Sequence, residues 1–380
     1  MRACVLTTVH PYNDNRIFYK QIRTLLKAGY QVTYIAPCPP GVNRLEGIDL
    51  VPLPRLPRSH RPLNWWRALR AALRSRADIF HFHDPELIGV GLLLRMLTGR
   101  PVIYDIHESY PQAVLGKRWI PGWSRPLIAK AVRLLEWLAG RAFDGIVVPV
   151  PVIYERFRRS SRRSVLVHNY VDLGLFDYEE EGASPVLAQP YFVYAGSIST
   201  DRGALDCLAA FERLSREDVH LILVGRRSDT DPSVRDLPGH LSRGVYLLDM
   251  QPFERIPSLL RRSRAGLAPI RATPQYLDAL PTKVLEYMAA SKPVIASDLP
   301  LVRGIIEEAG CGLLVEPGNV EQLAEAMAYI LDHPAEAEEM GRRGRRAVVE
   351  RYSWETEGQR LLGLYEEVLG SNPHTEMENA

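Results

Sequence analysis

The chain has 380 residues, of which 46% are hydrophobic and 24% are charged, as in an ordinary globular protein. Because a domain has about 100–200 residues, this length predicts two domains. The longest apolar run, residues 87–97, is too short to span a bilayer and contains Arg95, and the first residues lack the apolar core of a signal peptide. We therefore expect a globular chain that begins with a strand.

The formal net charge of +2 hides an asymmetry between the two halves of the chain. Residues 1–170 contain 26 Lys and Arg against 11 Asp and Glu, a charge of +15, and the remainder contains 21 against 34, a charge of −13. This asymmetry supports two domains and predicts that the N-terminal half meets an anionic partner. The cysteines, at 4, 38, 207 and 311, lack metal-ligand or redox spacing, so we expect reduced thiols in a cytoplasmic protein.

Short apolar segments rich in β-forming residues alternate with helical segments along the whole chain. Such alternation, with nearly continuous apolar strands, is typical of parallel sheets that are covered by helices on both faces. The predicted fold class is therefore α/β. The predicted strands are residues 3–9, 31–37, 49–54, 79–84, 101–108, 145–150 and 164–169 in the first half, and 191–197, 220–225, 245–250, 265–270, 293–298 and 312–316 in the second.

An acidic segment that contains Gly and Pro and lacks periodicity is predicted to link the two domains. Helices are expected at 17–29, closed by Gly29, and at 353–369. The predicted boundaries are an N-terminal domain at 1–171, a linker at 172–190, a C-terminal domain at 191–352 and a polar tail, expected to be disordered, at 370–380.

The loop after the predicted strand 191–197 is a candidate phosphate site. In open parallel sheets, ligands bind beyond the carboxyl ends of the strands. Gly196 and Gly203 bracket a tight strand-to-helix turn, and Arg202 stands at the start of the helix. Backbone N–H groups at a helix N-terminus and a guanidinium together suit phosphate. The alternative is an ordinary turn with a solvated arginine.

Two acids and a lysine stand where another helix is predicted to begin. Pro281 suits the first turn of a helix, so Thr282 and Lys283 would lie at its positive end, where an anion is favoured. Glu286 shares a face with Lys283 and could accept hydrogen bonds from the two hydroxyls of a ribose. Asp278 could reach another hydroxylated group. Alternatively, Lys283 and Glu286 form a surface ion pair.

The C-terminal half resembles glycosyltransferase family 4. The similarity lies in LPTKVLEYMAASKPVIASD, followed by GCGLLVEPGNVEQLAEAM and YSWE. Family members are retaining enzymes of the GT-B fold that use nucleotide-sugar donors, and their signature is two acids with seven residues between them, as Asp278 and Glu286 have. The resemblance implies that Glu286 holds the donor ribose. It also implies that Asp278, where the family usually has Glu, contacts hydroxyls of the donor sugar.

The resemblance further implies where the donor phosphates and base bind. The family usually has a Gly-Arg pair followed five residues later by Lys, and here the two basic positions fall on Ser197 and Arg202. One cation is missing, so Arg202 and Lys283 are expected to carry the diphosphate charge. The base is expected at the strand ends near Gly225 and Met250, largely through backbone groups. The implied donor-binding residues are Gly196, Ser197, Arg202, Gly225, Met250, Thr282, Lys283 and Glu286.

Residues 9–35 are similar to the first strand–helix–strand unit of one branch of the family, whose first loop carries an Asp-x-Arg step. Asp14 and Arg16 match that step, whereas the usual Gly-Gly is absent. Together with His83 they are candidates for the acceptor side; alternatively, Asp14 and Arg16 form a structural ion pair that fixes the loop. A histidine at a strand end contacts the donor sugar in the family, and His107 matches it. The catalytic candidates are His107, Asp278, Arg202 and Lys283.

His81 and His83 lie on one face of a predicted strand, because alternate strand residues point to the same side. Asp84 and Glu86 follow them. A metal site is one interpretation, but no third converging ligand is identified, so we expect the histidines to line the cleft or to form hydrogen bonds at the strand end. The Asp-x-Asp step at 229–231 resembles the metal-binding motif of a different glycosyltransferase fold and is interpreted as a solvated loop.

Basic and aromatic residues cluster at 61–76 and 116–141. Tryptophan beside Arg and Lys on amphipathic stretches is typical of a helix at an anionic membrane surface, and would suit a lipid-linked acceptor. The alternatives are a core helix with a solvated basic face and a nucleic-acid surface. No nucleic-acid motif is found, so no nucleic-acid partner is predicted.

The resemblance implies a GT-B fold, in which two Rossmann-like domains have parallel sheets facing across a cleft that holds the active site. Helix 353–369 would pack back on the N-terminal domain. The expected enzyme moves a hexose from a UDP- or GDP-sugar to an acceptor hydroxyl with retention, needs no metal or other cofactor, and acts in the cytoplasm or at the inner membrane face. A sugar-nucleotide epimerase and a non-catalytic nucleotide-sugar-binding protein remain alternatives. An NAD enzyme is not expected, because no G-x-G-x-x-G follows a strand.

Overall fold

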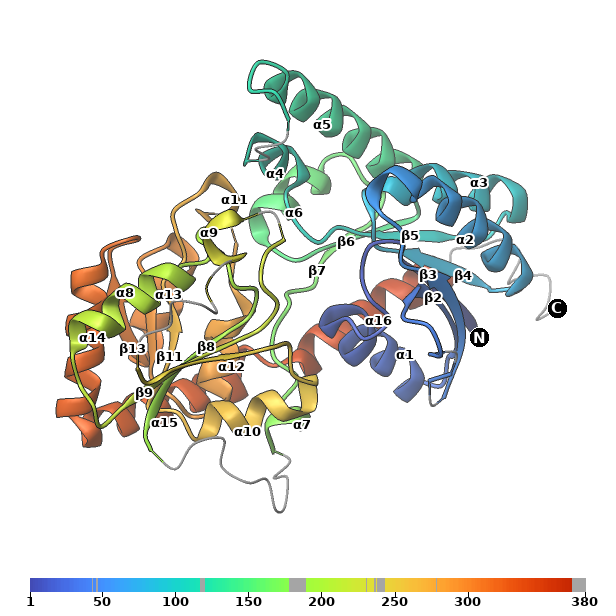
Figure 1. Cartoon of the computed structure of the whole chain (residues 1–380). Coiled ribbons are helices and arrows are strands. Elements are labelled where there is room, and N and C mark those ends of the chain that lie inside the picture. Colours follow the sequence, from blue (N-terminus) through green and yellow to red (C-terminus); the bar gives the residue numbers. More distant parts are fainter. Residues whose placement is uncertain are drawn as a thin grey trace. The chain divides into compact units, whose positions relative to one another are not determined.

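The computed structural model describes residues 1–42, 44–45, 47–116, 120–177, 189–229, 231–235, 237, 243–277 and 279–370 (Figure 1). The chain divides into two compact units. Unit 1 comprises Met1–Asn169 and the C-terminal segment from Trp354, and unit 2 comprises Tyr170–Ser353. Most of the predicted linker, residues 178–188, and the predicted tail from residue 371 lie outside the described residues.

Unit 1 contains a seven-stranded sheet in which all neighbouring strands are parallel. Its strands are β1 (Arg2–Leu6), β2 (Gln31–Cys38), β3 (Ile48–Pro54), β4 (Ile79–Phe82), β5 (Val102–Asp105), β6 (Gly145–Val148) and β7 (Ser164–Leu166). Their order is β3-β2-β1-β4-β5-β6-β7. The order reverses between β1 and β4, and ligands bind at such a reversal.

The helices of unit 1 cover both faces of this sheet. Cys4 and Leu6 of β1 belong to one buried apolar cluster and Ala3 and Val5 to another, as expected when both faces are buried. The helices are η1 (Asn15–Ile22), α1 (Arg23–Lys27), η2 (Arg58–His60), α2 (Pro62–Arg74), η3 (Pro85–Leu87), α3 (Ile88–Thr98), α4 (Tyr110–Gly116), α5 (Arg125–Ala142), α6 (Pro151–Arg158) and α16 (Trp354–Gly370).

Unit 2 contains a six-stranded parallel sheet with the order β10-β9-β8-β11-β12-β13. The chain order reverses between β8 and β11, so the loops after these two strands flank the expected ligand position. The strands are β8 (Tyr191–Ala195), β9 (His220–Val224), β10 (Val245–Leu248), β11 (Ala265–Ala268), β12 (Val294–Ser297) and β13 (Gly312–Val315).

The helices of unit 2 likewise pack on both faces of its sheet. They are α7 (Gly174–Asp177), α8 (Ala204–Leu214), α9 (Pro232–Arg235), η5 (Phe253–Arg255), α10 (Ile256–Arg261), α11 (Pro274–Leu277), α12 (Thr282–Ala289), α13 (Pro300–Ala309), α14 (Val320–Asp332) and α15 (Pro334–Arg351). Within the described ranges of both units, no helix combines the length and the hydrophobicity needed to cross a bilayer.

The predicted strands are confirmed, and each begins within one residue of its predicted start. Most end one to three residues earlier than predicted, because the last residues of each apolar run belong to the loops at the carboxyl ends of the sheets. The α/β class and the two parallel sheets are confirmed as well. The residues that the pattern assigned to strand ends are therefore the loop residues available for a site.

The predicted helix at 17–29 begins two residues earlier, as wide π-type turns that continue into α1. Asp14 caps it, since its carboxylate accepts hydrogen bonds from the backbone N–H groups of Arg16 and Ile17 at 2.9 and 3.0 Å. Gly29 follows the helix with a φ of 84°, as a residue that ends a helix often does.

Helix α16 belongs to unit 1, although it is separated from the rest of that unit in sequence. The indole N–H of Trp354 donates to Thr24 at 2.9 Å. Leu364 packs against Gly145 of β6, since a Cβ built on Gly145 would lie 3.2 Å from the Leu364 side chain. The C-terminal helix therefore completes one face of the N-terminal sheet.

Helix α12 is fixed to the sheet of unit 2 by Tyr287. A Cβ at Gly266 of β11 would lie 2.0 Å from the Tyr287 ring, so the ring can pack there only against glycine. The Tyr287 hydroxyl accepts a hydrogen bond from the backbone N–H of Ala195 at 2.9 Å and donates to the carbonyl of Leu267 at 3.1 Å. These contacts tie α12 to β8 and β11, and so position the residues at its start.

Replacing Gly266 by alanine should destabilise unit 2 by about 1–3 kcal/mol, because the added methyl group displaces Tyr287. Gly304 of α13 is a matched control, since a Cβ there would meet nothing within 4 Å. Gly304→Ala should instead stabilise the protein by about 0.4–1 kcal/mol. Chemical denaturation of the full chain measures both. Equal stabilities of the two variants would contradict the packing described for Gly266.

Candidate functional site

Glycines shape the loop after β8 in unit 2. Gly196 and Gly225 have φ values of 127° and 147°, which glycine adopts far more readily than other residues. A Cβ at Gly225 would lie 1.9 Å from the backbone oxygen of Gly196. A Cβ at Gly203, just before α8, would lie 1.8 Å from the backbone oxygen of Pro269. Backbone from Gly196 to Gly203 is therefore held directly against the ends of the neighbouring strands.

The ammonium group of Lys283 lies beside Gly196. A Cβ built on Gly196 would be 3.5 Å from Nζ, and Nζ lies 3.5 Å from the centroid of the Tyr194 ring. Lys283 is 5% exposed, yet within the described parts of the chain Nζ has no hydrogen-bond acceptor. Burying an ammonium group without a hydrogen-bond acceptor has a large unfavourable free energy. The contact with the Tyr194 ring offsets only about 2 kcal/mol or somewhat more of it. A buried cation of this kind is a feature of anion sites.

Burial, and after it the charge of Arg202, lowers the pKa of Lys283 from 10.5 to about 7, against smaller opposing effects of Cys207 and Glu286. The ammonium and amine forms of Lys283 therefore coexist near neutral pH. An anion beside Nζ stabilises the charged form. Binding of an anion and protonation of Lys283 are thus thermodynamically linked.

Arg202 stands on the loop between β8 and α8. Its Nε donates a hydrogen bond to the hydroxyl of Tyr276 in α11 at 3.0 Å. The loop after β11 is tied to the same region, because the backbone N–H of Arg271 donates to the carbonyl of Asp201 at 3.0 Å and its Nε donates to Asp206 of α8 at 2.9 Å. The loops at the sheet reversal are therefore joined, and Arg202 is oriented by one of them.

Asp231, which lies in the loop after β9, also holds the loop after β8 in place. Its carboxylate accepts hydrogen bonds from the backbone N–H groups of Thr200 at 2.7 Å and Ser233 at 3.1 Å. Asp229, by contrast, is exposed and pairs with Arg226 at 2.5 Å. Asp229 thus fits the interpretation of 229–231 as a solvated loop, whereas the half-buried Asp231 is in addition a structural partner of the loop that carries Arg202.

The other predicted donor residues surround the start of α12 and the strand ends. Lys283 is buried, so the alternative of a surface ion pair with Glu286 is wrong. Pro281 precedes α12 as its N-cap residue and does not occupy its first turn. Thr282, Glu286 and Ser197 are half-buried, Met250 is 67% exposed, and Asp278 lies outside the described residues.

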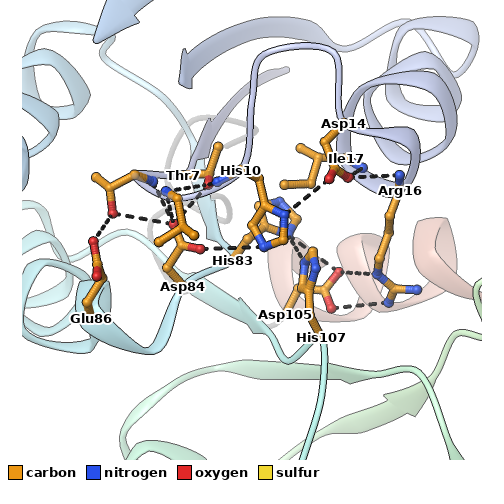
Figure 2. Close-up of polar contacts among 12 residues, drawn as sticks. Thr7, His10, Asp14, Arg16, Ile17, His83, Asp84, Glu86, Asp105 and His107 are labelled. Atoms are coloured by element: carbon orange, nitrogen blue, oxygen red, sulfur yellow. Dashed lines mark hydrogen bonds and ion pairs between the residues drawn. The ribbon is translucent and has the colours of Figure 1, made fainter. Parts of the chain in front are cut away.

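Unit 1 buries a charged cluster at the ends of its central strands (Figure 2). Asp105 accepts hydrogen bonds from Nε and Nη2 of Arg16, at 3.2 and 3.1 Å, and from the amide of Gln21. Nη1 of Arg16 donates to the carbonyl of Val167 at 3.1 Å. This bidentate, charge-assisted geometry is the strongest that a guanidinium and a carboxylate form. The alternative of an ion pair between Asp14 and Arg16 is therefore wrong, since Arg16 pairs with Asp105.

Asp84 joins the loop after β1 to the end of β4 (Figure 2). Its Oδ2 accepts hydrogen bonds from the backbone N–H groups of Thr8 and Val9, at 2.6 and 3.1 Å, and from the hydroxyl of Thr7 at 2.8 Å. Glu86 accepts from the hydroxyl of Thr8 at 2.7 Å. Because these loops flank the reversal of strand order, Asp84 and Glu86 fix the expected ligand edge of unit 1.

His83 and His107 form a hydrogen-bonded pair at this edge. Nδ1 of His83 lies 3.1 Å from Nε2 of His107, and Oδ2 of Asp105 lies 3.6 Å from the same Nδ1. The carboxylate favours a proton on Nδ1 of His83, which then donates to His107 and leaves the His107 proton on Nδ1. Burial is the main cause that lowers the pKa of both histidines well below the usual value. His107, which is half-buried, therefore offers a neutral N–H donor.

The first loop folds around a charged histidine, His10. Its Nδ1 lies 3.1 Å from Asp14 and its Nε2 lies 3.6 Å from Asp84. Burial lowers the pKa of His10, but the hydrogen bond to Asp14 and the charges of Asp14, Asp84 and Asp105 outweigh burial and raise it to about 9. The His10 ring packs against His107 in a tilted arrangement, with centroids 4.4 Å apart. An imidazolium between two carboxylates thus holds the loop in which the family's usual Gly-Gly is absent.

A third converging group is present beside His81 and His83. These histidines and Asp105 offer ligand atoms within 4.8 Å of one another, which corrects the prediction that no third ligand converges. However, both oxygens of Asp105 accept hydrogen bonds from Arg16, and Nδ1 of His81 lies 2.8 Å from the hydroxyl of Tyr365. The guanidinium already balances the carboxylate charge that a cation would need. The donor set therefore suits an ion pair better than a metal ion.

Sequence reasoning missed His10, Tyr276 and Asp231 and the central position of Asp105. His10 directly follows the first predicted strand, so the rule that singled out the other strand ends could have found it. Asp105 lies in the predicted strand 101–108, but its partner Arg16 is 89 residues away in sequence. Tyr276 belongs to a four-residue helix that no periodicity could predict.

Two family models match most of the chain. Residues 15–175 match the model described as Glycosyltransferase Family 4, and residues 189–333 match the model described as Glycosyl transferases group 1. The first match covers most of unit 1 and the second covers most of unit 2.

Curated relatives are similar over most of their length. An MMP alpha-(1->4)-mannosyltransferase of Mycolicibacterium hassiacum is 25% identical over 80% of this chain and 74% of that protein. A phosphatidyl-myo-inositol mannosyltransferase of Mycolicibacterium smegmatis is 24% identical over 94% of this chain and 90% of that protein.

Solved structures share the fold. Sucrose-phosphate synthase from Thermosynechococcus elongatus has a TM-score of 0.77 at 20% identity, covering 97% of this chain and 99% of that chain. HepE from Anabaena, in complex with UDP-glucose, has a TM-score of 0.71 at 14% identity, covering 97% and 100%. The two parallel Rossmann-like sheets and these likenesses show the GT-B fold. The family matches show that the chain belongs to glycosyltransferase family 4 and is a glycosyltransferase.

Proposed function

We propose that this enzyme transfers a hexose from a UDP- or GDP-sugar to an acceptor hydroxyl, with retention of the anomeric configuration. The proposal rests on the buried ammonium group of Lys283. This group lies beside Gly196, and its pKa is lowered first by burial and then by the positive charge of Arg202. A donor diphosphate supplies the negative charge that this pair of cations favours.

The proposed catalysis rests on stabilising the leaving group. As the sugar departs, negative charge grows on the diphosphate, and prepositioned positive groups lower the energy of that state more than that of the intact donor. Arg202 and Lys283 would supply the side-chain charge, and the N-terminus of α12, at Thr282, would add its backbone N–H groups. With these cations built in, the reaction would need no metal or other cofactor.

With the diphosphate placed beside Arg202 and Lys283, the other predicted residues would contact the rest of the donor. Glu286, one turn after Lys283, would accept hydrogen bonds from both ribose hydroxyls, and Gly225 and Met250 would line the base. Asp278 would contact hydroxyls of the transferred sugar. His107 would donate from Nδ1 to a sugar hydroxyl, since Nε2 is engaged by His83.

Retention would proceed by substitution on one face of the sugar, in which the leaving phosphate removes the acceptor proton. This route needs no protein nucleophile. Among the acceptor-side candidates, Arg16 and His83 are buried and hydrogen-bonded to other groups. They would act by holding the histidine cluster in place. Asp14 would act through His10.

The acceptor is proposed to be lipid-linked or a surface glycan, with the enzyme acting at the cytoplasmic side of a membrane. The relative named a phosphatidyl-myo-inositol mannosyltransferase supports a lipid acceptor by its name. The Anabaena structures with UDP and UDP-glucose support a nucleotide-sugar donor. Residues 1–170, which make up most of unit 1, carry a charge of +15, and this suits an anionic lipid carrier.

The proposed function predicts that a nucleoside diphosphate sugar stabilises the protein and is turned over. A thermal-shift screen of UDP- and GDP-sugars identifies the donor, and donor consumption is then measured with acceptor. Arg202→Ala should lower turnover about a hundredfold or more, because a group aimed at developing charge is lost. Arg216→Ala, a surface arginine of unit 2 paired with Asp218, should leave turnover unchanged. Donor binding without transfer would indicate a binding protein, and an epimerised donor would indicate an epimerase.

The affinity for the nucleoside diphosphate should fall as the pH rises above 7. In the free protein Lys283 loses its proton with a pKa of about 7, and a bound diphosphate raises that pKa. Above pH 7 binding must therefore take up a proton, so affinity should fall by up to about tenfold per pH unit until the pKa of the complex is reached. Calorimetry in two buffers of different ionisation enthalpy measures both affinity and proton uptake.

Lys283→Met is the control for this pH dependence. The variant should bind more weakly near pH 7 and should take up no proton in the alkaline range, because its side chain does not titrate. The same alkaline slope in the variant and in the parent protein would exclude Lys283 as the group that meets the diphosphate.

Glu286→Ala should weaken nucleoside diphosphate binding by about 10- to 100-fold, as expected when a carboxylate loses two hydroxyl donors. The parent protein should show the same loss with a 2′,3′-dideoxy nucleotide, and the variant should no longer distinguish the two ligands. Glu321→Ala, at an exposed position of α14, serves as the control. If Glu286→Ala still prefers the ribonucleotide, the ribose assignment fails.

A further inference from the structure

Helix α5 of unit 1 exposes the side that a globular protein normally buries. Apolar residues recur at intervals of three and four, so they form one continuous stripe along the helix. Leu127, Leu134 and Leu138 are 62%, 57% and 49% exposed. Further exposed apolar residues on or next to the helix are Trp123, Ile128, Leu135 and Trp137.

The opposite side of α5 is the buried one, and it holds small residues and an acid. Ala129 and Ala139 are buried there, and a Cβ at Gly140 would lie 3.2 Å from the Phe157 ring of α6. Glu136 is also buried and pairs with Arg156 of α6 at 2.9 Å. In Figure 1, α5 lies beside α4 and α6 within its unit. The helix is therefore anchored through its small residues, and its leucines point away from the core.

The other basic and aromatic segment, 61–76, forms α2, which buries one side but leaves Leu63 and Trp66 54% and 61% exposed. In α2 the residues Ala68, Leu69 and Ala72 are buried, and the indole of Trp65 donates a hydrogen bond to Glu86 at 3.2 Å. The two segments differ in what they bury. Helix α2 buries Leu69, whereas every leucine of α5 is exposed.

The exposed charged residues of α5 are all basic. Lys130, Arg133 and Arg141 are exposed, and Arg141 lies 3.7 Å above the Trp137 ring. Glu136 is the only acid of α5, and it is buried in its ion pair. An apolar stripe edged by Lys, Arg and Trp is complementary to an anionic lipid surface. A second copy of this basic unit would instead face like charge.

We propose that the exposed face of α5 docks on an anionic lipid bilayer. Leu127, Leu134 and Leu138 would enter the boundary between headgroups and acyl chains, and the basic residues would meet lipid phosphates. This inference deepens the proposed function, because a lipid-linked acceptor lies in that surface. The docking itself needs no sugar transfer and can be tested without it.

The test is co-sedimentation of the full chain with phosphatidylcholine vesicles that contain or lack phosphatidylglycerol. The protein should bind the anionic vesicles at low salt and bind less at high salt. Leu134→Glu should lower the partition coefficient about tenfold or more, since a leucine no longer enters the bilayer. Lys130→Gln should lower it about fivefold, on anionic vesicles only.

Val349→Glu is the matched control, because Val349 of α15 is 51% exposed and the change in charge is the same. It should bind vesicles like the parent protein. No binding at low salt, or equal binding of Leu134→Glu and Val349→Glu, would overturn the proposal. A dimer in the absence of lipid that Leu134→Glu dissociates would also overturn it, because the face would then be a subunit interface.

Nucleotide affinity separates this inference from the proposed function. Leu134→Glu should bind the nucleoside diphosphate as the parent protein does, which also shows that the variant is folded. Vesicle binding without nucleotide binding would refute the proposed function and leave the docking face intact. Nucleotide binding without vesicle binding would refute the docking of α5 on lipid and leave the proposed function intact.

Discussion

The site in unit 2 depends on an ammonium group that the fold removes from water without giving it a hydrogen-bond acceptor among the described residues. Lys283 is held in that position because α12 is fixed by Tyr287, whose ring fits only against Gly266 and whose hydroxyl bonds to two neighbouring strands. The backbone at Gly196 then runs directly beside Nζ. The packing of the whole unit offsets the free-energy cost of this burial, so the Lys283 side chain is in place before an anion arrives, and the anion then stabilises its charged form.

Unit 1 uses buried charge in the opposite way. Arg16 and Asp105 neutralise one another, and His10 is held between Asp14 and Asp84. Burial chiefly lowers the pKa values of His81, His83 and His107, and the direction of the hydrogen bond between His83 and His107 follows from the nearest carboxylate. Unit 2 thus buries a positive charge that has no hydrogen-bond acceptor among the described residues, whereas unit 1 buries its charges in pairs.

The candidate donor site could be predicted to a large extent, because its residues follow strands or begin helices. Arg202 and Lys283 come from such positions, and the spacing of Glu286 from Lys283 is local. Tyr276 and Asp231 could not be predicted, since each contributes through a partner in another loop. The same holds for Asp105, whose importance depends on Arg16, 89 residues away.

The sequence by itself determined the strands, their parallel arrangement and the division into two sheets, because apolar runs of strand length between helical segments admit few other folds. It also located the residues after the strands, where ligands of such sheets bind. Only the tertiary structure decided which charges are buried, which are paired and which face of a helix is covered. The composition of α5 is that of many core helices, and its exposed leucines are recognised only once the packing of Gly140 and Glu136 is known. Burial and pairing depend on contacts between residues that are far apart in the chain, so local sequence patterns do not predict them.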